Sequence, residues 1–322
     1  MTAPSRGAHV RSGASWSRRL VALPVGLALL AVVLLCGLAW VGIHQSSDTV
    51  QSDAQGRVRS NRDAAVRALV LQTDDLKRTV ATWSENALVI DSLRAPTPAA
   101  LGQVQQQLTT LAHSKDSPSV FVADTRGRIV AIYPAQPELI GKDFSFRDWF
   151  QGVARTGRPY VSAAYGSAVN GHPTVVGVVS PVLERSRRLG YVAVLWQLES
   201  IRSVSVDSHR DDGITVTMTD QRGQPLTGTL AVDDRGQPRP AALSASTRQA
   251  LAGRSVSTVS GGMIEEAGPV PGIGWTVTAA LPSSVALASA HALQRSLQVT
   301  LGVALLLVLL FTMLAWLSLI HI

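Results

Sequence analysis

The chain of 322 residues contains a single cysteine, Cys36, and this residue lies inside an apolar run. Disulfide bonds, thiolate chemistry and cysteine-ligated metals are therefore not expected in the rest of the chain. Its seven histidines share no metal-ligand spacing, and G-x-S-x-G, phosphate-loop and dinucleotide-binding motifs are lacking. We therefore expect no catalytic residues, no metal and no cofactor, and the residues present do not predict an enzyme.

Acidic residues are missing from the N-terminal region, where Arg6, Arg11, Arg18 and Arg19 account for much of the net charge of +7. Without these four, 25 basic residues stand against 22 acidic ones. No basic patch with interleaved aromatic residues remains, so nucleic acid is not an expected partner. Only three lysines accompany 26 arginines, a composition typical of a GC-rich bacterial genome.

Two long runs carry no charge, residues 20–43 and residues 299–316. At about 1.5 Å per residue, each is long enough to cross a hydrocarbon core of about 30 Å. We predict transmembrane helices at 20–43 and 296–320. The positive-inside rule places the basic tail, residues 1–19, in the cytoplasm, so residues 44–295 are predicted to be extracytoplasmic on a bacterial plasma membrane. A cleaved signal peptide is the alternative for the first run. This run is longer than the apolar region of a usual signal peptide, and no typical cleavage site follows it.

The last six residues, 317–322, read LSLIHI. The same six residues are the translation of an adapter used in transposase-based sequencing libraries. We therefore expect that they are adapter-derived and that the chain is truncated before a cytoplasmic output domain. A natural membrane span with an apolar tail is the alternative.

A helical region follows the first apolar run. Residues 51–90 carry an apolar stripe at alternating spacings of three and four, with Leu69 on it and Thr73 as its one polar break. This pattern predicts one long helix. A second helix is predicted over 98–113, with Pro98 near its start.

From residue 119 the pattern changes to short β-like runs separated by turns. The first set covers 119–124, 128–134, 174–182 and 189–198, and the second covers 213–220, 224–232, 254–260 and 274–282. Each set contains a D-x-R-G turn, at Asp124 and at Asp220, in which the aspartate binds the turn backbone and the glycine accepts a positive φ. S-P-V and G-P-V segments match later in the same order, which favours a duplicated α+β module over a chance pair of hairpins.

Residues 141–150, GKDFSFRDWF, place charges among aromatic rings. Ser145 and Asp148 have the S-x-x-D spacing of a capping box. This spacing predicts a helix from Phe146 to about Arg155.

Within that helix, Arg147 would lie in the first turn, where the helix dipole disfavours a cation, so we expect an anion nearby. Two readings remain open. An ion pair with Asp143 or Asp148 would supply the anion. Alternatively, the guanidinium, the free N–H groups of the helix start and the Trp149 indole would bind a ligand carboxylate.

Several segments together resemble a known family. IGKDFSFRDWF, GRPYVSAAY, VVSPV and G-YVAVL, which follow a long helix, resemble the distal half of a bacterial double Cache sensor domain, and GPVPGIGWTVTAALPSSVALA resembles its proximal half. The resemblance covers residues 48–290. It implies an α+β fold, in which a long N-terminal helix precedes two PAS-like antiparallel-sheet modules, distal over 44–204 and proximal over 205–290, flanked by two transmembrane helices.

The resemblance also implies a function. Double Cache domains are the extracytoplasmic ligand-sensing parts of bacterial histidine kinases, chemoreceptors and cyclases, and the distal module usually binds the ligand. The expected partners are therefore a small ligand, the lipid bilayer and a second copy of the chain in a homodimer. A membrane-anchored adhesion or cell-wall-binding protein is the alternative, which predicts no enclosed pocket near Arg147.

A subset of this family binds amino acids through an R-x-W-Y run, a later tyrosine and an aspartate on the last distal strand. The arginine, tryptophan and later tyrosine match here, phenylalanine replaces the tyrosine of the run, and Leu195 stands where the aspartate is expected. The resemblance thus implies a site for a carboxylate without a partner for an ammonium group. We expect a small organic anion rather than an α-amino acid. The predicted ligand-binding residues are Arg147, Trp149, Phe150 and Tyr165, with Tyr160 and Lys142 as lesser candidates.

Overall fold

The computed structural model describes residues 14–201, 213–226, 242–286 and 288–320. One compact unit, Ala54–Ser283, contains both β-sheets, and the remaining residues form a second unit. Among the residues described, no helix combines the length and the apolar character that a bilayer crossing requires. The spans predicted at 20–43 and 296–320 thus gain no support from the structure, and many of their side chains lie outside the described part.

The helical region contains three helices where two were predicted. Helix α1 covers Ala14–Ser84 and α2 covers Ala87–Arg94, so the single helix predicted over 51–90 is interrupted. Asn86 causes the new start, because its side chain accepts a hydrogen bond from a backbone N–H of the first turn of α2. Helix α3, Pro98–Ser114, confirms the second predicted helix.

The first sheet is antiparallel and has five strands in the order β2-β1-β5-β4-β3. The strands are β1 Val120–Asp124, β2 Ile129–Tyr133, β3 Tyr160–Gly166, β4 Thr174–Glu184 and β5 Arg187–Gln197. All of these except β3 were predicted as strands. The connection from β2 to β3 contains the 3-10 helix η1, Pro137–Leu139, and helix α4, Asp148–Thr156.

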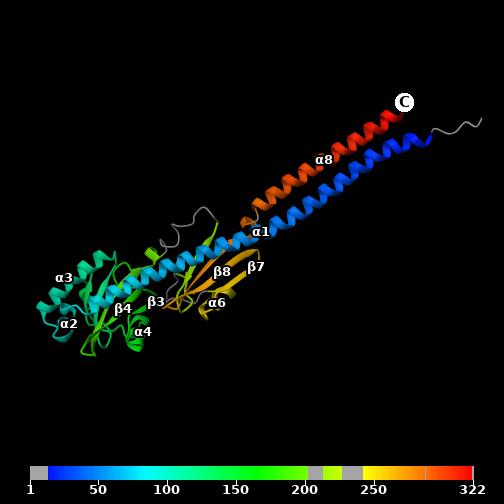
Figure 1. Ribbon diagram of the computed structural model, residues 1–322. Helices are drawn as coiled ribbons and strands as arrows, with labels where there is room; N and C mark the ends of the chain where they lie inside the picture. Colours follow the sequence, from blue (N-terminus) through cyan, green and yellow to red (C-terminus); the bar gives the residue numbers. More distant parts are fainter. Residues whose placement is uncertain (1–13, 202–212, 227–241, 287, 321–322) are drawn as a thin grey trace, which may run out of the picture. The chain divides into compact units, whose positions relative to one another are not determined.

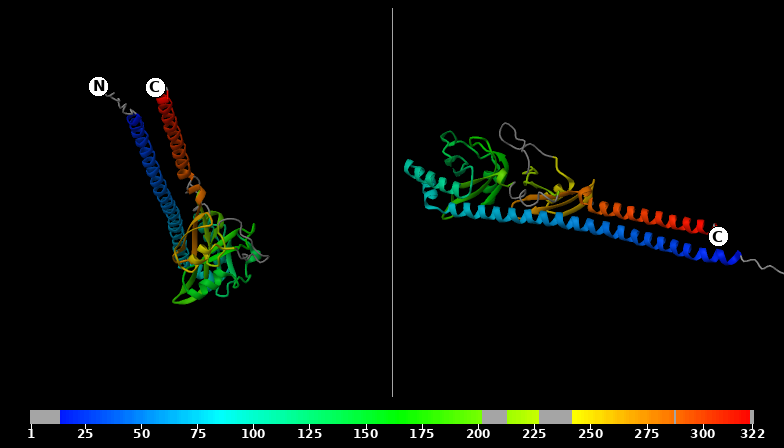
Figure 2. Two further views of the ribbon diagram at one scale, coloured as in Figure 1. Left: turned by 90° about the vertical axis from the view of Figure 1, so that its right-hand side faces the viewer. Right: turned by 90° about the horizontal axis from the view of Figure 1, so that it is seen from above.

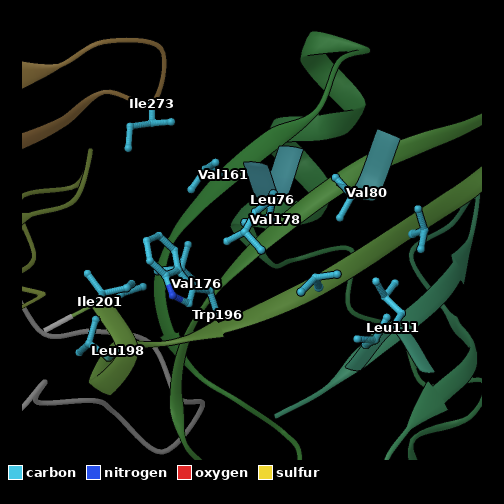
Figure 3. Packing of buried hydrophobic residues seen from close by; sticks show 14 of the residues in the cluster. Leu76, Val80, Leu111, Val161, Val176, Val178, Trp196, Leu198, Ile201 and Ile273 are labelled. Carbon is cyan, nitrogen blue, oxygen red and sulfur yellow. The ribbon is translucent and has the colours of Figure 1, made fainter. Parts of the chain in front are cut away.

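Both faces of this sheet are buried. Successive side chains of a strand point to opposite faces, so each strand contributes to two cores. On β5, Val192, Val194 and Trp196 enter a core shared with α1, α2 and α3, whereas Tyr191, Ala193 and Leu195 enter a second core with α4. Figure 3 shows side chains of the first core, including Leu76 and Val80 of α1 and Leu111 of α3. The second core is the one that encloses the cavity described below.

The second sheet has four strands in the order β6-β9-β8-β7 and packs against the short helix α6, Ala245–Leu251. Its strands are β6 Thr215–Thr219, β7 Val256–Ser260, β8 Met263–Val270 and β9 Trp275–Pro282. Strand β8 and helix α6 were not predicted, and most of the run predicted over 224–232 lies outside the described residues. Helices α7, Ser283–Ala286, and α8, Ala288–Ile320, follow.

The two sheets lie one after the other along α1, on the same side of it (Figures 1 and 2). They share a hydrophobic core with that helix, in which Leu69 of α1 and Val270 of β8 are both buried. Trp196 of β5 stacks on Trp275 of β9, with ring centroids 6.2 Å apart. The predicted α+β fold with a long helix and two antiparallel sheets is confirmed, whereas the module boundary predicted at 204 and 205 lies outside the described residues.

Candidate ligand site

A cavity lies against the α4 face of the five-stranded sheet. Its empty volume is about 350 Å³ with the open mouth included. Nine of its twelve lining residues are apolar, two carry a hydroxyl group, and one is charged. The lining consists of Phe121, Ile129, Ile132, Leu139, Phe144, Arg147, Trp149, Tyr165, Ser167, Ala168, Val169 and Leu195.

Arg147 is the charged residue, and only 5% of it is exposed. It occupies the N-cap position, with φ −76° and ψ 146°, so α4 begins at Asp148, two residues later than predicted. Its guanidinium carbon lies 4.8 Å from the ring centroid of Tyr165 and 5.1 Å from that of Phe146. Cation–π contacts of this kind hold the guanidinium against the rings at one side of the cavity.

The predicted capping box is wrong. No side chain caps the start of α4, and the Ser145 backbone N–H instead donates to the Asp143 carboxylate at 2.8 Å. That hydrogen bond lowers the pKa of Asp143. The carboxylate of Asp148 points elsewhere, because it accepts the backbone N–H of Ala163 at 2.7 Å. Asp148 also forms an ion pair with Arg222 at 2.8 Å.

Trp149 and Tyr165, two of the predicted ligand-binding residues, are both buried and both line the cavity. Burial raises the pKa of the Tyr165 hydroxyl, so this group is a neutral hydrogen-bonding group at physiological pH. Gly177 of β4 lets both rings approach the sheet, because a Cβ there would lie 3.3 Å from the Trp149 Cβ and 3.3 Å from the Tyr165 Oη. Gly177 pairs with Leu195 of β5, which also lines the cavity.

Three of the predicted site residues do not line this cavity. Phe150 packs between the rings of Trp149 and Tyr191, at centroid distances of 5.9 and 5.3 Å. Tyr160 donates its hydroxyl to Asp148 at 3.2 Å, and burial raises the pKa of Tyr160. Lys142 is exposed.

The sequence did not predict several of the lining residues as site residues. They are the apolar lining residues on β1, β2 and η1, together with Phe144, Ser167, Ala168 and Val169. A leucine or isoleucine that lines a cavity has the same sequence pattern as one that packs in a core. Of these residues, Ser167 has a side chain that can form a hydrogen bond with a ligand. Its hydroxyl accepts the Val169 N–H at 3.2 Å and retains a proton to donate.

The two D-x-R-G turns have the same internal geometry, as the predicted duplication requires. Asp124 accepts the N–H groups of Arg126 and Arg128 at 2.8 and 2.9 Å, and Asp220 accepts those of Arg222 and Gln224 at 2.9 and 2.8 Å. The glycines have φ values of 79° and 81°. The two turns therefore differ only in what their remaining atoms contact.

The second turn binds the first sheet next to the cavity. Asp220 is fully buried, and its second carboxylate oxygen accepts the Ala164 N–H of β3 at 2.9 Å. Gln221 donates to Asp148 at 3.3 Å and accepts the indole N–H of Trp275 at 2.8 Å. Asp148 and Asp220 thus bind consecutive N–H groups of β3, within the irregular stretch of its pairing with β4. We call this set of contacts the β3 clamp.

An α+β unit with two antiparallel sheets, whose first sheet encloses a mostly apolar cavity with one charged lining residue, has the features of a module that binds a small ligand. The family model of the Cache domain, in its double form dCache_1, matches residues 43–290. The chain belongs to this family.

Solved structures of sensor domains have a similar fold. The sensor domain of the V. cholerae histidine kinase DctB is 13% identical with a TM-score of 0.53, and the match covers 72% of this chain and 98% of that one. The ligand-binding domain of the Pseudomonas fluorescens chemoreceptor CtaA, in complex with L-isoleucine, is 14% identical with a TM-score of 0.57 over 76% and 98%. The sensory domain of the Campylobacter jejuni chemoreceptor Tlp3, with isoleucine bound, is 14% identical with a TM-score of 0.52 over 74% and 97%. A search of curated protein sequences finds no match.

Proposed function

We propose that this chain is the ligand-sensing part of a bacterial membrane receptor and binds a small organic anion in the cavity of its first sheet. The observation that carries the proposal is Arg147, which is 5% exposed and is the one charged side chain among the twelve described lining residues, nine of which are apolar. A guanidinium binds a carboxylate through two parallel hydrogen bonds, and hydrogen bonds to charged groups contribute about 1.5 to 3 kcal/mol each.

In this proposal the chain crosses the membrane twice, at 20–43 and 296–320, and residues 44–295 are extracytoplasmic. The support is in the sequence, where both segments have charge-free cores and four arginines precede the first. Such a receptor would act as a homodimer and pass its signal to a histidine kinase, chemoreceptor or cyclase output domain. The similar structures come from a histidine kinase and from chemoreceptors.

An α-amino acid is the second candidate ligand, since the similar CtaA and Tlp3 structures contain L-isoleucine, L-serine and other amino acids. An amino acid brings an ammonium group into the cavity together with its carboxylate. The twelve described lining residues include no carboxylate side chain, and Leu195 lies where the resemblance predicts an aspartate. A buried charge without a partner is strongly unfavourable, so the organic anion fits better.

Isothermal titration calorimetry on the full chain in detergent, with panels of carboxylates and of amino acids, tests the proposal. Carboxylates should bind, and Arg147→Gln should abolish binding without changing the melting temperature by more than a few degrees. Arg158→Gln is the control, because Arg158 is exposed in the same module and does not line the cavity. Tight binding of amino acids with no response to carboxylates would refute the anion proposal. A response to neither class would favour the adhesion alternative.

A further inference from the structure

The charge content of the cavity limits the head group of its ligand. Arg147 is the only charged side chain among the twelve lining residues. One guanidinium matches one carboxylate, and its planar edge is the part that forms the paired hydrogen bonds. A dicarboxylate would place its second charge against apolar side chains, and an α-amino acid would do the same with its ammonium group. Both require desolvation of a charge for which these twelve described residues offer no second charged partner.

The walls of the cavity select the rest of the ligand. Phe121 and Trp149 lie edge to face with ring centroids 5.1 Å apart, and Ile129, Leu139 and Leu195 complete an apolar surface. Hydroxyl groups come only from Tyr165 and Ser167, so a polyhydroxylated ligand would lose more hydrogen bonds to water than it could regain. The empty volume of about 350 Å³ includes the open mouth, so the enclosed space is smaller and restricts the ligand to a short tail.

Leu195 is the position where a second charge could have been placed. It is 2% exposed, lines the cavity, and pairs on β4 with Gly177. Gly177 in turn lies against Trp149 and Tyr165. A leucine here extends the apolar wall beside Trp149 and beside Tyr165, whose ring the Arg147 guanidinium contacts, whereas a carboxylate at the same position would make the cavity complementary to a zwitterion.

From these observations we infer that the cavity selects a monocarboxylate with a short apolar tail, of the branched aliphatic or arylalkyl type. The inference rests on the proposed anion-binding function and narrows its ligand class. The carboxylate binds at Arg147, and the tail lies among the aromatic and aliphatic side chains. Each further CH₂ that the cavity buries should tighten binding roughly fourfold, until the volume is filled.

A series of matched ligands tests the inference by titration calorimetry on the full chain in detergent. Acetate, butyrate and 4-methylpentanoate vary the tail. L-Leucine is 4-methylpentanoate with an ammonium group, adipate has the same number of carbons with a second carboxylate, and 4-methylpentanamide lacks the charge. We expect affinity to rise along the tail series, and 4-methylpentanoate to bind at least about tenfold more tightly than the last three.

The outcomes separate the inference from the proposed function. If acetate binds as tightly as 4-methylpentanoate, or adipate binds more tightly, the apolar-tail class is refuted while anion binding stands. If L-leucine binds as tightly as 4-methylpentanoate, both the ligand class and the preference for anions over amino acids fail. If no carboxylate in the series binds, the proposed function fails with it.

Leu195→Asp provides an independent test of the same selectivity. The new carboxylate should reverse the preference, so that L-leucine binds more tightly than 4-methylpentanoate. Leu195→Asn introduces a side chain of the same size as aspartate without its charge. It should lower the affinity for 4-methylpentanoate without raising the affinity for L-leucine. Leu183→Asp, at a leucine that is 47% exposed on β4, should change neither affinity. Melting temperatures show whether each variant is folded, and a folded Leu195→Asp that keeps the wild-type preference would overturn the inference.

Discussion

Replacing Asp220 by asparagine should weaken the contact between the two sheets, because the substitution changes one atom of the β3 clamp. Asparagine keeps an oxygen that can accept the turn N–H groups of Arg222 and Gln224. Its other atom becomes an NH₂ group at the place where Asp220 accepts the Ala164 N–H at 2.9 Å. Two donors then face each other in a fully buried position.

The expected loss of unfolding free energy follows from the hydrogen bond that the substitution removes and from the desolvation of the carboxylate that it relieves. A hydrogen bond to a charged acceptor contributes about 1.5 to 3 kcal/mol, and the unpaired Ala164 N–H adds a desolvation penalty. Burial raises the pKa of Asp220, an effect that its three backbone hydrogen bonds oppose, so the ionised carboxylate already carries an unfavourable desolvation. We therefore expect a loss of about 2 kcal/mol in unfolding free energy near neutral pH.

The same pKa shift fixes the sign of the pH dependence. A carboxyl group whose pKa is raised on folding contributes stability that is fully present below its ordinary pKa of 3.8, and this contribution is lost as the pH rises through the folded value. Asparagine does not titrate. The difference in stability between wild type and Asp220→Asn should therefore be larger at acidic pH than at neutral pH.

The duplicated turn provides a matched control. Asp124 makes the same two turn hydrogen bonds as Asp220, and it has no hydrogen bond to the other sheet among the described residues. Asp124→Asn should therefore change stability by less than about 0.5 kcal/mol. Urea unfolding of the full chain in detergent, followed by circular dichroism, measures both. Equal losses for the two variants would refute the reasoning, because the effect would then belong to the turn and not to the clamp.

Two further predictions concern packing and buried charge, with urea unfolding as the measurement. Gly152→Ala in α4 should destabilise by about 1 to 3 kcal/mol, since the new Cβ would lie 2.1 Å from the Tyr160 ring. Gly102→Ala in α3, where nothing lies within 4 Å, should instead stabilise by up to about 1 kcal/mol, and the same sign for both would contradict this account. Glu266→Gln should destabilise by about 1 to 3 kcal/mol, because it removes the ion pairs of this 1% exposed carboxylate with Arg59 and Arg62 of α1, of which Arg62 keeps its second partner, Asp63. A change below about 1 kcal/mol would show that Asp63 and water satisfy these arginines when Glu266 is neutralised.

The sequence predicted the parts of the fold that local chemistry specifies. The D-x-R-G turns were found because Asp and Gly are needed there for backbone reasons alone, and both turns have the expected geometry. Strand β3 was missed, since its small residues and Tyr160–Gly166 length give no clear alternation when every position from Val161 onward is buried. Its burial comes from α4, which directly precedes it, and from the turn at Asp220, which is distant in sequence and gives no local signal in β3.

In the candidate site, too, the sequence indicated what is unusual locally and missed contacts between distant segments. Arg147 was found because a cation beside aromatic rings is unusual locally, whichever partner it takes. The role of Asp148 was missed, because the S-x-x-D spacing also fits a capping box and its real partner, Arg222, is 74 residues away. Spacing within one segment cannot distinguish a cap from a long-range ion pair.

The β3 clamp and the cavity share neighbouring residues, and this adjacency has an energetic consequence. Tyr165 lines the cavity and directly follows Ala164, whose N–H binds Asp220 of the second turn. Arg147 directly precedes Asp148, the other carboxylate of the clamp. A ligand that moves Arg147 or Tyr165 must therefore either carry the second turn with it or weaken these hydrogen bonds. The protein then has two arrangements of the clamp, one with the hydrogen bonds intact and one with them shifted or weakened. The ligand can change their populations only to the extent that it binds the two arrangements with different affinity. If the arrangements differ, Asp220→Asn should change the affinity for 4-methylpentanoate although Asp220 does not line the cavity, whereas Asp124→Asn should not. Identical affinities in wild type and both variants would mean that binding leaves the clamp unchanged and that any signal travels by another route.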